Sequence, residues 1–252
     1  MLAPSSGEPR LLERDAELAV LGEVLARAAA RRPGLVAIEG PGGIGKTRLL
    51  REAQGRAERA GMLVLVARGS ERERQLPFGV VEQLFGPGFH EIRGVGTHAN
   101  SEEAADDTDT SFSTFAALVR MTERLSADRP LVLVVDDLHL SDEPSLQFFG
   151  YLARRFGRLS ATLIGTLRPF ERSPTAALLS ELVGDPLTVS IRPQPLTDEA
   201  TAALVTQRLG SPADATFSAA CRRPPAATPC CSMSCSRRCA SSGCRPTSPA
   251  WG

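Results

Sequence analysis

The sequence predicts an α/β fold with a central, mostly parallel sheet of about five strands flanked by helices. Short apolar runs alternate with longer segments of helical spacing across residues 11–214. Residues 131–135 are five consecutive branched apolar residues, which is typical of a strand buried on both faces in the middle of a parallel sheet. Hydrophobic residues make up 42% of the 252 residues, enough for the core of such a domain.

The elements can be assigned from their periodicity and from the residues that end them. The expected strands are residues 35–39, 62–67, 131–135, 161–167 and 187–191. The expected helices are residues 14–31, 47–60, 77–85, 112–125, 143–156 and 198–209. Pro33 with Gly34 stops the first helix, Gly61 stops the second, and Thr197 caps the last.

A complete phosphate-binding motif lies between the first expected strand and the second expected helix. The pattern G-x-x-x-x-G-K-[ST] is matched by Gly40, Pro41, Gly42, Gly43, Ile44, Gly45, Lys46 and Thr47. The glycines let successive backbone N–H groups converge on phosphate oxygens, and the following helix adds the positive end of its dipole. The alternative is a glycine-rich turn with a chance lysine, but the strand, loop and helix follow in the required order. The fold is therefore predicted to be that of a P-loop NTPase, with ATP and Mg²⁺ as its cofactors.

Lys46 is the only lysine in the chain, and the other 28 basic residues are all arginine. A compact ammonium group on a flexible stem can reach the β- and γ-phosphates inside the loop, whereas a planar guanidinium group would not fit there. We therefore expect Lys46 to bind the nucleotide and to act in catalysis. Thr47 is expected to place its hydroxyl group on Mg²⁺.

Two carboxylates, Asp136 and Asp137, follow the buried run 131–135. They lie at the carboxyl end of a strand, where open α/β sheets bind their ligands. In a P-loop enzyme Asp136 would hold Mg²⁺ through water, and Asp137 would orient or deprotonate the attacking water. The alternative is a pair of solvated turn residues, which the complete phosphate loop makes less favourable.

Composition and charge exclude several other classes. The formal net charge is zero, which favours neither direct DNA binding nor attraction to a membrane surface. No apolar stretch approaches the length of a membrane span, and the first ten residues lack the pattern of a signal peptide. We expect a cytoplasmic protein with no membrane partner.

The composition also divides the chain into segments. Residues 1–10 are expected to be a flexible N-terminus, residues 11–214 the ATPase domain, and residues 94–110 a disordered acidic insertion within it. Residues 215–252 form an atypical tail rich in Cys, Pro, Ser and Arg, which we expect to be disordered.

Four landmarks resemble the ATPase module of large ATP-binding regulators of the LuxR type, which are signal-transduction ATPases related to AAA+ proteins. The landmarks are residues 12–18, 40–47, 136–146 and 165–169. The resemblance covers roughly residues 10 to 220. It implies that Arg168 is a sensor of the γ-phosphate, on a strand between the loop strand and the acidic strand. A surface arginine at a strand end is the other interpretation. The chain departs from the family where Glu13 replaces a usual Gly and Leu140 a usual Trp.

The tail contains every cysteine of the chain: Cys221, Cys230, Cys231, Cys235, Cys239 and Cys244. Zinc binding is one interpretation, but the segment has no histidine and no C-x2-C pair. Our hypothesis is a frameshift near Cys221 or Arg222, because reading plausible GC-rich codons in another frame yields a helical pattern. That hidden peptide resembles the Gly-x-Pro segment that begins the family's nucleotide-contacting lid.

The expected function is an ATP-binding, weakly hydrolysing switch module of a LuxR-type transcriptional regulator, C-terminally truncated. It would lack the sensor repeats and the DNA-binding domain, and its partners would be nucleotide and itself or other regulator subunits. The alternative is a non-catalytic interaction fragment that binds other regulator subunits. A module associated with a nucleotide cyclase is a distant third interpretation.

Overall fold

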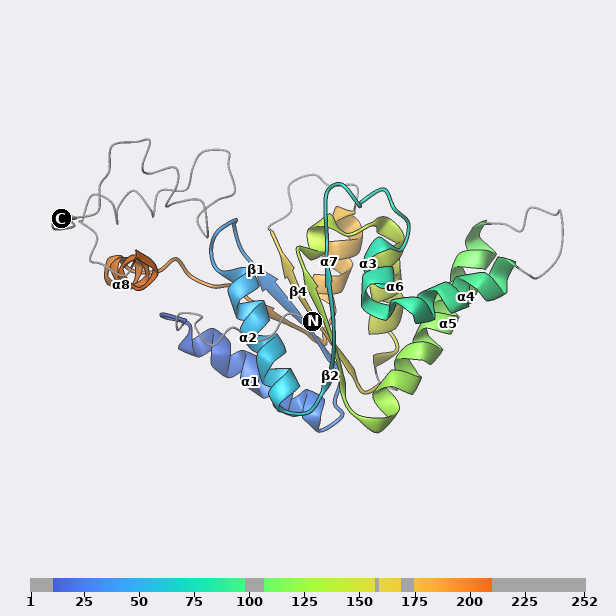
Figure 1. Cartoon of the computed structure of the whole chain (residues 1–252), viewed down its shortest axis with the longest axis horizontal. Coiled ribbons are helices and arrows are strands. Elements are labelled where there is room, and N and C mark those ends of the chain that lie inside the picture. The colour runs from blue at the N-terminus through green and yellow to red at the C-terminus, as the bar shows by residue number, and fades with distance from the viewer. Residues whose placement is uncertain (1–10, 98–106, 157–158, 169–174, 210–252) are drawn as a thin grey trace, which may run out of the picture.

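The strands of the described residues form one parallel sheet (Figure 1). The computed structural model describes residues 11–97, 107–156, 159–168 and 175–209. The strands are β1 (Gly34–Glu39), β2 (Leu63–Arg68), β3 (Leu131–Asp136), β4 (Ala161–Leu167) and β5 (Thr188–Ile191). Their order is β2-β3-β4-β1-β5, and all four pairings are parallel. The predicted α/β fold with a five-stranded sheet is confirmed.

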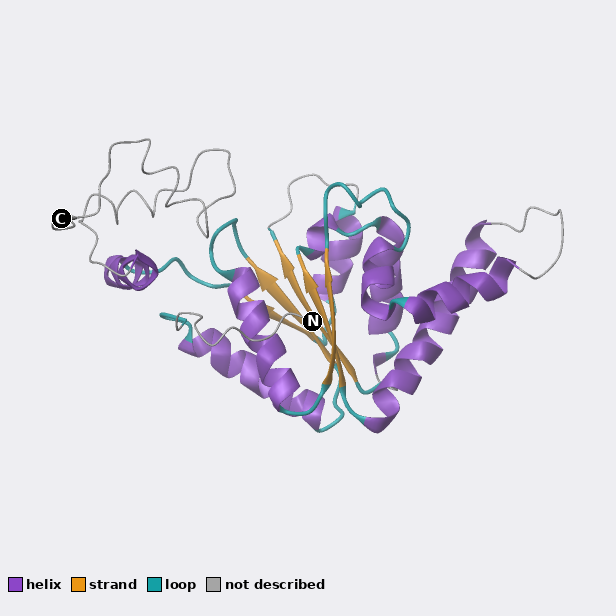
Figure 2. Cartoon of the chain, in the orientation of Figure 1, coloured by secondary structure: helices purple, strands orange, loops and turns teal. Residues whose placement is uncertain are grey.

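Helices cover both faces of the sheet (Figure 2). One face carries α1 (Asp15–Ala29) and α2 (Lys46–Arg59). The other carries α3 (Gly79–Phe85), α5 (Asp107–Asp128), α6 (Glu143–Ala153) and α7 (Ala176–Gly184). The remaining helices are α4 (Pro87–Thr97), which packs against α3 and α5, the short η1 (Leu138–Leu140) and α8 (Asp198–Leu209).

The strand β3 explains why the core has two halves. Leu131, Leu133 and Val135 belong to the cluster beneath α3, α5 and α6, whereas Val132 and Val134 belong to the cluster beneath α1 and α2. All five side chains are at most 1% exposed. A fully buried aliphatic side chain contributes roughly 1.5–3 kcal/mol, so this strand needs apolar residues at every position. The strand predicted to be buried on both faces is confirmed.

The sequence interpretation is corrected at two places. Residues 94–110 were expected to lack structure throughout, but α4 reaches Thr97 and α5 begins at Asp107; residues 98–106 lie outside the described residues. Gly88 permits the close packing of α4 on α5, since a β-carbon at this position would lie 2.1 Å from the terminal methyl of Met121. The sequence analysis also missed α7, whose buried Leu179 and Leu182 are spaced as on one helix face.

The predictions for residues 1–10 and for the cysteine-rich tail, residues 215–252, concern parts of the chain outside the described residues. They stay predictions.

The end of β2 packs directly on the backbone that follows β3. The N–H of Gly69 donates to the carbonyl oxygen of Asp136 at 2.8 Å. A β-carbon at Gly69 would lie 2.3 Å from the carbonyl oxygen of Asp137 and 3.1 Å from the nitrogen of Ser141. Only glycine allows the two backbones to approach this closely, so Gly69 fixes the position of the acidic segment.

We therefore expect Gly69→Ala to lower the free energy of unfolding by about 1–3 kcal/mol, the usual cost of overpacking. Gly150→Ala is the matched control, because a β-carbon at this position in α6 meets nothing within 4 Å. The control should gain about 0.5–1 kcal/mol, since alanine favours a helix interior over glycine. Urea denaturation measures both changes, and equal unfolding midpoints for the two variants would contradict the close approach at Gly69.

Candidate functional site

The predicted phosphate loop lies at the carboxyl end of β1 and leads directly into α2, so strand, loop and helix occur in the expected order. Gly43 and Gly45 have φ angles of 82° and 103°, a region that favours glycine. Gly45 is the N-cap of α2, and its carbonyl oxygen accepts from the N–H groups of Arg48 and Leu49. The loop therefore presents the start of a helix to whatever binds above the sheet.

The side chain of Lys46 turns back over the loop. Its Nζ donates to the carbonyl oxygens of Gly40 at 2.7 Å and Pro41 at 2.9 Å, and the residue is 6% exposed. Burial lowers the pKa of the Lys46 ammonium group, and Arg168 lowers it further, while Asp137 and Asp136 act in the opposite direction. The charge is thus held inside the loop by backbone carbonyl groups and the two acids.

Asp136, at the end of β3, is joined to α2 and to β4 through hydroxyl groups. Thr47 Oγ1 lies 3.1 Å from both carboxylate oxygens of Asp136, and Thr166 Oγ1 donates to Asp136 Oδ1 at 2.7 Å. Asp136 is 8% exposed, and Thr166 is fully buried. A buried carboxylate is costly unless it accepts hydrogen bonds, so the two threonines stabilise its position.

Asp137 is held by its backbone as well as by its side chain. Its φ angle of 53° lies in the left-handed region, and its N–H donates to Thr166 Oγ1 at 2.8 Å. Its carboxylate lies 3.2 Å from the guanidinium group of Arg68, which also approaches Asp136 at 3.9 Å. The Arg68 side chain is 71% exposed, so the pair contributes little to stability but neutralises part of the charge on Asp137.

Arg168 follows β4 and reaches the phosphate loop. A β-carbon at Gly42 would lie 3.7 Å from its Cζ. β4 lies between β1 and β3, as the resemblance implied for the strand that carries Arg168. The structure thus brings every predicted site residue to one edge of the sheet.

Sequence reasoning missed two neighbours of the acids, Thr166 and Arg68. Thr166 was seen only as a strand residue, and Arg68 was one of many arginines. The pairing register places Arg68 beside Asp136. It also pairs Val135 with Gly165, so Thr166 lies next to the acids. The strand order would have identified both residues, because their strands flank β3.

Two buried polar atoms beside the acids have no hydrogen-bond partner in the described structure, His139 Nδ1 and Ser141 Oγ. Burial lowers the pKa of His139; Asp137 raises it, and Arg168, Lys46 and Arg74 lower it. The imidazole therefore stays neutral in the folded protein at a pH where a solvated histidine would be protonated. His139 lies within residues 136–146, one of the landmarks on which the resemblance rests.

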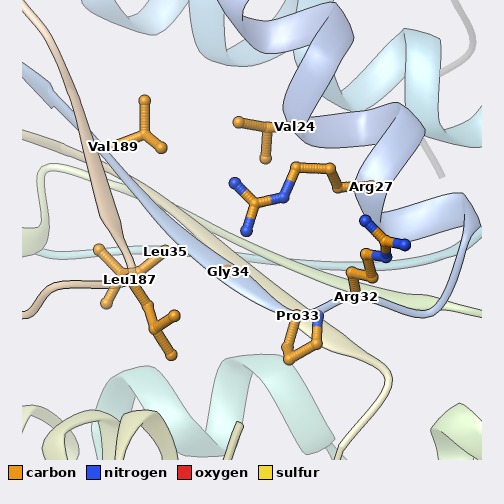
Figure 3. A pocket seen from close by; sticks show the side chains of 8 residues that line it. All are labelled: Val24, Arg27, Arg32, Pro33, Gly34, Leu35, Leu187 and Val189. Atoms are coloured by element: carbon orange, nitrogen blue, oxygen red, sulfur yellow. The ribbon is translucent and has the colours of Figure 1, made fainter. Parts of the chain in front are cut away.

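A hollow lies at the amino ends of β1 and β5, opposite the phosphate loop (Figure 3). It is lined by Val24, Arg27, Arg32, Pro33, Gly34, Leu35, Leu187 and Val189. These residues come from the end of α1, the start of β1 and the region of β5, so the hollow is remote from the phosphate loop.

No group of three or more His, Cys, Asp or Glu side chains within the described ranges could hold a metal ion.

The fold and the loop define the class of protein as a P-loop NTPase. The AAA ATPase domain family matches residues 10–164, and the chain belongs to this family. No curated protein matches the sequence. No helix in the described part of the chain is long and apolar enough to cross a membrane.

Solved structures with a similar fold include three proteins. Cdc6p from Pyrobaculum aerophilum has a TM-score of 0.54 at 19% identity. The Aeropyrum pernix ORC1 protein, solved in complex with DNA, has a TM-score of 0.51 at 22% identity, and each match covers 82% of this chain and 52% of the other. The Aeropyrum pernix ORC2 protein, solved as ADPNP–ADP complexes, has a TM-score of 0.51 at 15% identity, with coverage of 82% and 54%. The chain thus spans about half the length of these proteins.

The lowered pKa of His139 predicts how stability depends on pH. Below the ordinary histidine pKa of about 6.5, the unfolded chain binds a proton that folded His139 resists, so stability falls as pH decreases through this range. His139→Gln should therefore reduce the slope of the unfolding free energy against pH between about pH 7 and pH 5. Urea denaturation at a series of pH values measures the slope. His90→Gln, on an exposed side chain of α4, controls for the loss of a histidine. An unchanged slope in His139→Gln would contradict the assignment.

Proposed function

We propose that the chain is an ATP-binding module that hydrolyses ATP slowly and acts as a switch in a LuxR-type transcriptional regulator. One observation carries the proposal: the Lys46 ammonium group lies within the loop, while the Thr47 hydroxyl touches Asp136. A cation among backbone amides suits phosphate, and a hydroxyl group beside a carboxylate suits the metal ion that accompanies phosphate.

The residues present fit magnesium. Thr47 and Asp136 supply hard oxygen atoms from two adjoining elements, and Mg²⁺ usually takes one or two protein groups together with waters and phosphate oxygens. Thr47 would bind the ion directly, and Asp136 would hold it through water. When bound, the ion would neutralise the charge that develops on the phosphate oxygens.

The proposed rate is slow because the candidate base is partly neutralised. Asp137 would orient or deprotonate the attacking water, but its carboxylate is paired with Arg68 at 3.2 Å. Arg168, against the loop at Gly42, is positioned to sense the γ-phosphate through a charge-assisted hydrogen bond. Both roles are consistent with a switch that responds to which nucleotide is bound and hydrolyses ATP only slowly.

The regulator affiliation is the finer part of the proposal. It rests on the resemblance of residues 12–18, 136–146 and 165–169 to the landmarks of LuxR-type regulators. The sensing and DNA-reading functions of such regulators would belong to other parts of a longer protein. The partners of this module would be nucleotide and either a second copy or another regulator subunit.

Lys46→Ala is expected to abolish Mg-ATP binding, because it removes the only cation within the loop that can reach the β- and γ-phosphates. Isothermal titration calorimetry measures the affinity. The matched control is Arg59→Ala, an exposed cation in the last turn of the same helix, which should bind like the parent. Unchanged affinity in Lys46→Ala would contradict the assignment of the loop as a nucleotide site. It would favour the alternative of a non-catalytic interaction fragment, whose complexes with partners would not depend on nucleotide.

Thr166→Val should raise the Mg²⁺ concentration needed for ATP binding by about 10-fold or more, because groups that orient metal ligands typically matter by 10–100-fold. Titration of Mg²⁺ at fixed ATP measures the shift, and binding of ATP without Mg²⁺ should change little. Thr162→Val, at a buried threonine four residues earlier in β4, is the control. A shift of the same size in both variants would assign the effect to general destabilisation.

A further inference from the structure

The two residues before α1 connect segments that are far apart in the chain. Arg14 is 4% exposed, and its guanidinium group donates to three backbone carbonyls. These belong to Glu13 at 2.7 Å, to Ile44 in the phosphate loop at 3.2 Å, and to Gln194 after β5 at 2.8 Å. One side chain therefore bridges the start of α1, the phosphate loop and the segment that leads into α8.

Because Arg14 is buried, its guanidinium group needs hydrogen-bond partners within the protein. Its only ion pair among the described residues is with Glu17 at 3.8 Å, so the three carbonyl groups carry most of its hydrogen bonding. A buried charge is costly when its partners are lost. Moving either Ile44 or Gln194 away would leave donors of the guanidinium group unpaired, so the two segments are held in a fixed relation.

The contact at Ile44 also orients the loop. In a trans peptide the carbonyl group and the following N–H point in opposite directions. The peptide bonds are all trans within the described structure, so the N–H of Gly45 points away from the Arg14 guanidinium group that the Ile44 carbonyl faces. Gly45 belongs to the loop whose amide groups would face the phosphates. Arg14 is thus a positioning residue for the proposed nucleotide site.

Glu13 adds the second half of the connection. Its carboxylate accepts from the N–H of Thr197 at 2.8 Å and also from the Thr197 hydroxyl group. Thr197 Oγ1 in turn accepts from the N–H of Ala200 at 3.2 Å, which caps the start of α8. Glu13 therefore holds the first turn of α8.

Glu13 is an unusual residue at this position. Its φ angle of 52° is one that glycine adopts without strain and glutamate does not. Glycine is also the usual residue here in the family that the landmark resembles. The contacts made by the carboxylate with Thr197 are what glycine would lack.

We propose that Glu13 and Arg14 form a joint that couples the phosphate loop to α8. The proposal rests on the assignment of the loop as a nucleotide site. Arg14 ties the loop to the segment before α8, and Glu13 fixes α8 itself. A nucleotide that rearranges the loop changes the docking of α8, and by reciprocity the docking of α8 changes the affinity for nucleotide.

The test is hydrogen exchange of the α8 amides in the full chain, with and without Mg-ATP. The variants are Glu13→Gly, which suits the backbone angle and removes both contacts, and Thr197→Val. Each should speed the exchange of α8 about tenfold without nucleotide, the effect of losing a hydrogen bond to a charged group. The effects of the two substitutions should combine to less than their product in the double variant, because both remove the bond between the Thr197 hydroxyl group and Glu13, whereas only Thr197→Val also removes the bond from Ala200.

A second measurement examines Arg14. Arg14→Lys keeps the charge but cannot bridge three carbonyls with one planar group, so it should weaken Mg-ATP binding by about tenfold. Arg27→Lys, at an exposed position in the last turn of α1, is the control and should bind ATP like the parent (Figure 3). Thermal unfolding of each variant establishes that the chain is folded.

The outcomes separate the joint from the nucleotide assignment. In the parent, Mg-ATP should change the exchange of α8, and in Glu13→Gly this response should be lost although ATP still binds. Parental exchange of α8 in Glu13→Gly would overturn the joint, even if Thr197→Val exchanged faster through the loss of the cap on Ala200. If the parent bound no ATP, the proposed function would fail, while the comparison without nucleotide would still decide whether Glu13 holds α8.

Discussion

The candidate site depends on one chain of hydrogen bonds, from the Thr47 hydroxyl to the Asp136 carboxylate and on to the Thr166 hydroxyl. Asp136 is buried at the end of β3, an interior strand of the sheet, where an unsatisfied carboxylate would destabilise the fold. The hydroxyl groups come from α2 and β4, so the carboxylate is satisfied only when those elements stand in their observed order. The hydrogen bonds that stabilise the buried Asp136 carboxylate thus also place the phosphate loop beside it.

The sequence predicts the parts of this arrangement better than their relation. The apolar run 131–135 and the glycine-rich motif 40–47 are local patterns. The structure has β3 and the phosphate loop where these patterns predict them. The roles of Thr166 and Arg68 depend on which strands flank β3 and on the pairing register, and these are properties of the whole sheet. Helix α4 was missed for a related reason. Its glycines are unfavourable locally, and the close packing of Gly88 on Met121 becomes visible only once α5 is in place.

The net charge of the site is another property that local sequence patterns do not predict. Arg68 pairs with the two carboxylates, and Lys46 and Arg168 lie at the phosphate loop beside them, so the described cluster carries more positive than negative groups although the chain is neutral overall. Such a local excess at the carboxyl edge of a parallel sheet favours an anion there. The proposed ligand, a nucleotide phosphate with its metal ion, would supply the missing negative charge and displace Lys46 from the loop carbonyls.

The acidic segment is held at both ends, which limits where a conformational change can occur. Thr166 fixes Asp136 and the N–H of Asp137, and Gly69 packs on the backbone between. At the other end, the Asp142 carboxylate accepts from the N–H groups of Ser145, Phe78 and Val80, so it caps α6 and secures the start of α3. A segment so constrained keeps Asp137 in its left-handed conformation, since strain persists only where the surroundings over-determine it. Arg14, in turn, ties the phosphate loop at Ile44 to the segment before α8 at Gln194, so a movement of the loop in response to a ligand would be transmitted toward α8.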